Sequence, residues 1–214
     1  MKKILIPLIV TLAGIMVSCS EKEEPVESMI SGFVTAYTDH EGYVSIIRDD
    51  MGNEYQTDGK YSIQLPHYGY SEPDTSYRMV VSLAIGDNGH AHILQGVFVQ
   101  SSRAPESDAI PDVYKVKDPV QLNAAYIGGG FLNLTMGIKV HKEGSQHDMI
   151  YAHKSGSDKL KFIIYHNAHG DLATYTKYVY LSIPLDGYGL QKNDTVFIVT
   201  GDGNKDCETK AVYR

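Results

Sequence analysis

The chain has 214 residues and carries 26 acidic against 19 basic side chains, which gives a formal net charge of −7 at pH 7. Affinity for nucleic acid rests mainly on Lys and Arg side chains that neutralise phosphates, so this charge balance argues against nucleic-acid binding. The length allows one large domain or two small ones after any targeting segment.

The N-terminus has the pattern of a lipoprotein signal peptide. Lys2 and Lys3 precede an apolar run over residues 4–17. This run has about 14 residues, which is shorter than the roughly 20 that a membrane-spanning helix needs. It ends in Met16-Val17-Ser18-Cys19, where a small residue precedes the cysteine as a lipoprotein signal peptidase requires. We therefore predict that residues 1–18 are removed and that lipid on Cys19 anchors the protein to the outer membrane.

Residues 19–28 follow as an acidic tether, and two interpretations of it stay open. The segment Ser20-Glu21-Lys22-Glu23-Glu24 is either a solvated spacer or a signal that sends the lipoprotein to the outer cell surface. The first leaves the protein on the periplasmic face of the membrane, and the second places it on the cell surface. With Cys19 lipidated, Cys207 has no cysteine partner, so no intramolecular disulfide is expected.

Residues 29–112 are rich in β-branched and aromatic residues and show no helical periodicity. Strands are predicted over residues 30–37, 43–47, 61–65, 77–85 and 92–100, separated by turn signals. The last two, joined by Gly86-Asp87-Asn88-Gly89, are predicted to form a hairpin. Such a set favours a small barrel or sandwich. Residues 101–112 bring Ser, Pro and acidic residues, and we place the domain boundary there.

Residues 113–214 predict a second β domain. Gly128-Gly129-Gly130 is interpreted as a tight turn or bulge, because no Lys-Ser/Thr and no helix follow it as a phosphate-binding loop requires. Six strands at short intervals fit an antiparallel sandwich. They are predicted over residues 120–126, 131–140, 149–151, 160–166, 178–184 and 195–200.

Three blocks in the second half carry a family resemblance. Residues 118–134 contain Tyr126-Ile127-Gly128-Gly129-Gly130-Phe131, residues 162–171 read FIIYHNAHGD, and residues 180–186 read YLSIPLD. In this order and spacing the chain resembles the NigD-like family of bacterial lipoproteins. The resemblance implies an all-β protein with an N-terminal OB-like barrel and a C-terminal antiparallel β-sandwich on an outer-membrane lipoprotein. Since the family is named after a bacteriocin gene cluster, it implies an immunity or accessory role by association, and it supplies no catalytic residues.

Few residues suggest a chemical site. His166, His169 and Asp171 form the most metal-like cluster, but the resemblance explains them as a strand end and a turn, so we predict neither a metal nor a cofactor. Asp194-Thr195-Val196 resembles a short O-glycosylation acceptor, which makes Thr195 a candidate for modification.

Two functions from different classes remain. The first, which we favour, is a non-enzymatic lipoprotein that binds a protein or glycan partner, marked by an exposed aromatic patch without converging titratable groups. The second is a surface hydrolase acting on glycans or peptides. Its mark is either a carboxylate pair or His166, His169 and Asp171 meeting in one pocket.

Overall fold

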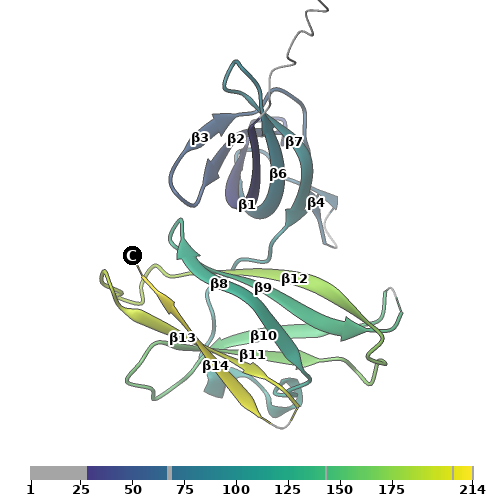
Figure 1. Ribbon diagram of the computed structural model, residues 1–214, viewed down its shortest axis with the longest axis vertical. Coiled ribbons are helices and arrows are strands. Elements are labelled where there is room, and N and C mark those ends of the chain that lie inside the picture. The colour runs from purple at the N-terminus through teal and green to yellow at the C-terminus, as the bar shows by residue number, and fades with distance from the viewer. Residues whose placement is uncertain (1–27, 67–68, 143, 204, 214) are drawn as a thin grey trace, which may run out of the picture.

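The computed structural model describes residues 28–66, 69–142, 144–203 and 205–213. The predicted signal peptide, the predicted lipidation site Cys19 and the tether as far as Glu27 lie outside the described residues. Two β domains follow one another along the chain, one above the other in Figure 1.

The N-terminal domain is one curled sheet of five antiparallel strands in the order β3-β2-β1-β6-β7. A single parallel bridge between Thr57 and Ala91 links the two edge strands, so the sheet is an open OB-like barrel without a closing ladder. A short hairpin, β4 (Gln64–Leu65) with β5 (Gly69–Tyr70), projects from it. The five strands are β1 (Ser28–Thr38), β2 (Val44–Asp49), β3 (Glu54–Gln56), β6 (Ser76–Ile85) and β7 (Ala91–Phe98).

The barrel core follows from the alternation of apolar residues along these strands, since every second side chain of a strand faces the same side. Val34 and Ala36 of β1 lie against Met79, Val81 and Leu83 of β6, and all five are at most 2% exposed. The predicted hairpin of β6 and β7 is confirmed by their antiparallel ladder.

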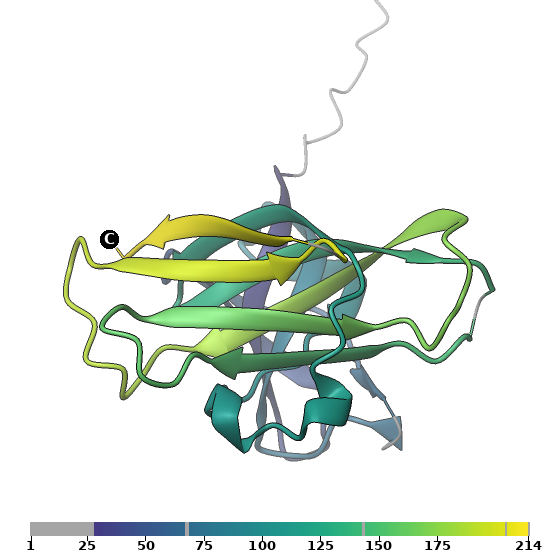
Figure 2. The ribbon, with the colours of Figure 1, turned by 90° about the horizontal axis from the view of Figure 1, so that it is seen from below.

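The C-terminal domain is a sandwich of two sheets. Three strands, in the order β12-β9-β8, form the layer next to the barrel, and four, in the order β10-β11-β13-β14, form the layer away from it (Figures 1 and 2). The strands are β8 (Val120–Gly128), β9 (Phe131–Val140), β10 (Asp148–His153), β11 (Lys161–Asn167), β12 (Tyr175–Pro184), β13 (Thr195–Gly201) and β14 (Asp206–Val212).

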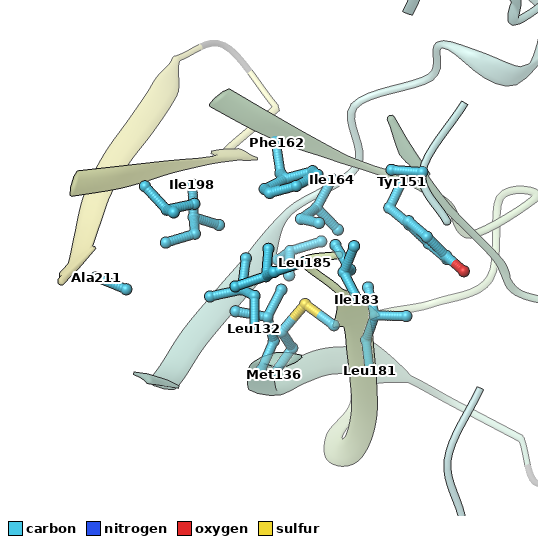
Figure 3. Packing of buried hydrophobic residues seen from close by; sticks show 14 of the residues in the cluster. Leu132, Met136, Tyr151, Phe162, Ile164, Leu181, Ile183, Leu185, Ile198 and Ala211 are labelled. Carbon is cyan, nitrogen blue, oxygen red and sulfur yellow. The ribbon is translucent and has the colours of Figure 1, made fainter. Parts of the chain in front are cut away.

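The sandwich core forms where the inner faces of the two layers meet. Figure 3 shows Leu132 and Met136 of β9 pointing at Phe162, Ile164 and other residues of the opposite sheet. All four are at most 1% exposed. The predicted all-β fold, with an OB-like barrel before a β-sandwich, is confirmed.

One strand pair departs from the predicted antiparallel sandwich. β11 and β13 are parallel, with Lys161 opposite Phe197. The reason is that β12, which lies between them in sequence, belongs to the other sheet, so the chain crosses the core twice before β13 runs beside β11. The prediction of a wholly antiparallel sandwich was therefore wrong at this pair.

A connecting segment closes part of one side of the sandwich. Residues 99–119 contain two short 3₁₀ turns, η1 (Ser107–Ala109) and η2 (Asp112–Tyr114). Ile110 between them packs on Ala152 and Tyr165, on the outer face of β10 and β11. The segment therefore acts as a cover over half of the distal sheet.

A buried arginine joins the two domains. Arg78 of β6 has a side chain 3% exposed and contacts both carboxylate oxygens of Asp50, the nearer at 2.9 Å. It also donates to Asn133 Oδ1 of β9 at 2.9 Å and to Ser182 Oγ of β12 at 3.4 Å. Its guanidinium carbon lies 4.3 Å from the centroid of the Phe131 ring, in cation–π range. The barrel is thus tied to the outer face of the three-stranded sheet.

The triglycine segment docks on the same aspartate. Gly129 and Gly130 have φ of +59° and +85°, which confirms the predicted tight turn between β8 and β9. The backbone N–H of Gly129 donates to the carbonyl oxygen of Asp50 at 3.1 Å. A Cβ at Gly129 would lie 2.6 Å from Asp50 Oδ1, whereas one at Gly130 would meet nothing within 4 Å. Glycine is therefore required at 129 for close approach as well as for backbone conformation.

The first prediction concerns Arg78. We expect Arg78→Met to lower the free energy of unfolding by about 3–5 kcal/mol, because it leaves Asp50 buried without its cation. Arg48→Met is the matched control, since Arg48 pairs with Glu54 at the surface, where such pairs contribute about 1 kcal/mol or less. Urea unfolding of both variants measures the difference, and equal losses would contradict a joining role for Arg78.

The second prediction uses the two neighbouring glycines. Gly129→Ala and Gly130→Ala both place a Cβ at positive φ, which costs about 1–2 kcal/mol. Only Gly129→Ala also displaces Asp50, so we expect it to lose a further 1–3 kcal/mol or so. Chemical denaturation of the pair checks this, and a Gly130→Ala variant as unstable as Gly129→Ala would show that the contact with Asp50 is unimportant.

Candidate functional site

A groove opens between the edge strands β10 and β12, on the side of the sandwich where the two sheets splay apart. Its volume is about 330 Å³. The floor is apolar, and the rim carries two lysines, a tyrosine, a serine and a histidine. The lining residues are Ile138, Val140, Met149 and Val179 below, and Lys142, Gly144, Ser145, His147, Tyr175 and Lys177 around them.

The groove is the uncovered part of this side of the sandwich. Farther along, the connecting segment pairs with both edge strands: Ser182 N donates to Gln100 O at 3.2 Å and His153 N donates to Pro105 O at 2.8 Å. Beyond these contacts the alternation of β12 directs Tyr175, Lys177 and Val179 into the groove. The arrangement leaves an amphipathic, positively charged cleft.

A chain of hydrogen bonds stands behind the groove. His147 Nδ1 lies 3.0 Å from His166 Nε2, and His147 Nε2 lies 3.1 Å from Asp171 Oδ2. His147 directly precedes β10, His166 is near the end of β11, and Asp171 follows in the next turn. The ring planes of the two histidines differ by 11° and their centroids are 5.3 Å apart. Together with the 3.0 Å between the two nitrogens, this means that the rings are nearly parallel and meet edge to edge.

The carboxylate fixes one end of this hydrogen-bond chain. The pKa of Asp171 is lowered to about 2, first by the backbone N–H of His141 and also by His147, so the carboxylate is ionised at neutral pH and can only accept. His147 Nε2 therefore donates to this carboxylate, and one proton is shared between His147 Nδ1 and His166 Nε2.

Burial keeps the inner histidine neutral. His166 is 2% exposed, and desolvation, followed by the nearby His147, lowers its pKa below the ordinary value of 6.5. The hydrogen-bond chain therefore ends in the neutral imidazole of His166, which protein encloses. Of its three residues, only His147 lines the groove. These hydrogen bonds join the segment before β10 to the turn after β11, and so fix this end of the groove.

The metal candidates from the sequence are only partly brought together. His147 links His166 to Asp171, whereas His169 turns away and pairs with Asp148 at 2.7 Å. A metal held by both His147 and His166 would need two lone pairs converging on a third point about 2.0–2.1 Å from each nitrogen. Here the two nitrogens point at each other with a proton between them. Among the described residues, no group of three His, Cys, Asp or Glu side chains has the geometry to hold a metal ion.

Thr195 begins β13 and is half-buried, opposite Val212 in the β13–β14 ladder. Its glycosylation stays a prediction.

Sequence reasoning missed three residues that define the site. His147 lies 19 positions from His166, and no spacing rule signals their contact. Tyr175 and Lys177 precede the predicted strand at 178–184, whose observed start is Tyr175. The alternation of Tyr175, Lys177 and Val179 could have extended that strand and indicated a shared face.

A comparison with known protein families assigns the C-terminal domain. The model of the NigD-like C-terminal β-sandwich domain matches residues 104–209. This part of the chain belongs to the NigD-like family. The resemblance inferred from the sequence is thereby confirmed.

Solved structures share the NigD-like fold over most of the chain. A NigD-like immunity protein from Bacteroides caccae is 24% identical, with a TM-score of 0.65, and the match covers 87% of this chain and 93% of that one. A protein from Parabacteroides distasonis, proposed to be toxin-related, is 18% identical over 86% and 92%, with a TM-score of 0.66. A proposed lipoprotein from Bacteroides fragilis is 12% identical over 87% and 99%, with a TM-score of 0.59. At these identities the likeness shows the fold. The comparison with curated proteins gives no match.

The third prediction is a pH dependence of the NigD-like domain. Because the pKa of His166 is lower in the folded than in the unfolded chain, the unfolded state binds the extra proton first. The stabilising contribution is complete above about pH 6.5 and is lost as the pH falls from there through the lowered pKa of the folded state. We expect His166→Gln to make the free energy of unfolding fall less steeply between pH 7 and 5, by at most about 1.4 kcal/mol per pH unit.

The control for this prediction is His40→Gln, a substitution at an exposed position of the barrel. Urea unfolding at several pH values compares the slopes of the three proteins. The interpretation fails if His166→Gln retains the slope of the unaltered chain, or if His40→Gln flattens it equally.

Proposed function

We propose that this chain is a non-enzymatic accessory lipoprotein of the NigD-like type, held on the outer membrane by lipid on Cys19, and that the groove between β10 and β12 binds a protein partner. The groove is the observation that carries the proposal. It combines an apolar floor with Lys142 and Lys177 on its rim, which suits a partner segment with apolar and acidic side chains.

The anchoring part of the proposal rests on the sequence of residues 1–19. The likeness to a proposed lipoprotein from Bacteroides fragilis agrees with it. Among the residues that the structure describes, no helix is long and apolar enough to cross a membrane.

An immunity or accessory role is supported by the names of two similar structures, a NigD-like immunity protein and a protein proposed to be toxin-related. Immunity requires tight capture of one partner without chemistry on it. A groove at a fixed place on a rigid sandwich supplies that requirement, because little ordering cost opposes binding at a preformed site.

The hydrolase alternative has weaker support. One of its two marks was His166, His169 and Asp171 meeting in one pocket. Instead, His166 is buried with its Nε2 against His147, His169 pairs with Asp148, and none of the three lines the groove. His147, which does line it, has both ring nitrogens engaged.

The fourth prediction tests the groove by site-specific photo-crosslinking in intact cells. A photoreactive amino acid at position 177 points into the groove, and one at position 178 projects from the opposite face of the same strand. We expect a discrete protein adduct at 177 and none at 178. In the 177 protein, Tyr175→Ala is expected to reduce the adduct about tenfold, the effect of losing about 1.4 kcal/mol of binding. Equal adducts at both positions, or no adduct at 177, would remove the groove as the binding site.

The anchor is tested separately with Cys19→Ala. We expect the unaltered protein to sediment with outer membranes and the variant, which lacks the cysteine needed for lipidation and cleavage, to be missing from that fraction. Protease treatment of intact cells then distinguishes the two faces of the membrane, because a cell-surface protein is cleaved and a periplasmic one is protected. A Cys19→Ala variant that still reaches the outer-membrane fraction would contradict lipid anchoring and leave the groove proposal intact.

A further inference from the structure

The outer face of the distal sheet is covered on one half only. Ile110 of the connecting segment packs on Ala152 and Tyr165 of β10 and β11. Figure 2 looks onto this face and shows the central parts of β13 and β14 uncovered in the foreground. The open half lies on the side of the sandwich away from the barrel (Figure 1).

Strand register gathers lysines on the open half. Lys161 of β11 and Lys210 of β14 are both paired with Phe197 of β13, one on each side, so the three residues form a row across the sheet. Lys159 joins the row from the loop before β11. The three ammonium groups lie 5.2 Å (Lys159), 5.7 Å (Lys161) and 5.5 Å (Lys210) from the centroid of the Phe197 ring. We call these three lysines around Phe197 the lysine patch.

The charge of the lysine patch is only partly balanced. Glu208 forms an ion pair with Lys161, and no ion pair of Lys159 or Lys210 is found among the described residues. Lys161 in particular, with help from the other two lysines, lowers the pKa of Glu208. A local excess of positive charge thus persists in a chain whose net charge is −7. Holding three like charges around one ring is unfavourable without a counter-charge, which an anionic ligand would supply.

We propose that the lysine patch binds an anionic polysaccharide, through carboxylate or sulfate groups repeated along the polymer. The proposal concerns a different face from the groove and does not depend on what the groove binds.

Three features favour this class of ligand. Lysine ammonium groups are compact, hydrated point charges that accept an anion from many directions, unlike the planar fork of arginine. The row follows the spacing between strands, so it offers successive charges to an extended polymer. Phe197 is half-buried with cations over it, so the patch has no exposed aromatic centre of the kind that dominates protein interfaces.

The fifth prediction tests the patch with defined polymers. Heparin is the probe, and binding of the purified chain is measured by calorimetry at low and at physiological salt. We expect the triple variant Lys159→Gln, Lys161→Gln, Lys210→Gln to bind roughly tenfold more weakly, with a smaller dependence on salt. The matched control is Lys60→Gln, Lys139→Gln, Lys192→Gln, which removes the same charge elsewhere and is expected to bind like the unaltered chain.

Other outcomes would overturn the proposal. The patch is not the site if heparin fails to bind, or if both triple variants weaken binding equally. Poly-L-glutamate and vesicles of phosphatidylglycerol serve as competing anions. If either binds at the patch as tightly as heparin, the ligand class is an acidic protein or a membrane surface, and the polysaccharide assignment is wrong.

Discussion

The buried pair of Arg78 and Asp50 is the contact on which the arrangement of the two domains depends. Burying a guanidinium requires acceptors for its five N–H groups. Arg78 donates four hydrogen bonds, to Asp50 Oδ2, Thr35, Asn133 and Ser182, and its Nη1 also forms an ion pair with Asp50 Oδ1 at 2.9 Å. Two of these residues belong to the sandwich, so the charge of the barrel is satisfied only when the domains are docked. Separating the domains would remove two acceptors from the Arg78 guanidinium. The two domains are therefore held in one orientation.

This orientation decides which faces of the sandwich are covered and which are exposed. The barrel occupies the outer face of the three-stranded sheet, with Phe33 set edge-on against Tyr126 and Tyr180 at ring-centroid distances of 6.0 Å. The connecting segment then crosses the splayed side of the sandwich and covers half of the distal sheet. The groove between β10 and β12 and the lysine patch both stay open, and they face different ways. Two ligands can therefore be held at once without competing for space.

Most of the fold could be predicted from local sequence patterns, because alternation and turn residues are properties of short segments. The hairpin of β6 and β7 and the turn at Gly128–Gly130 are of this kind. What could not be predicted depends on contacts between distant segments. Asp50 lies in the turn after β2, but its role comes from Arg78, 28 positions away, and from a turn some 80 positions away. The parallel pairing of β11 with β13 and the contact of His147 with His166 have the same origin.

The shared hydrogen bonds of Arg78 also restrict how such a chain can change during evolution. Replacing the arginine alone strands Asp50, and replacing Asn133 or Ser182 alone leaves a guanidinium N–H without an acceptor. We expect each single replacement to destabilise the docked arrangement, and a joint exchange to apolar residues of similar volume to cost little. Positions 50, 78, 133 and 182 should consequently vary together among related proteins, although they lie in two different domains.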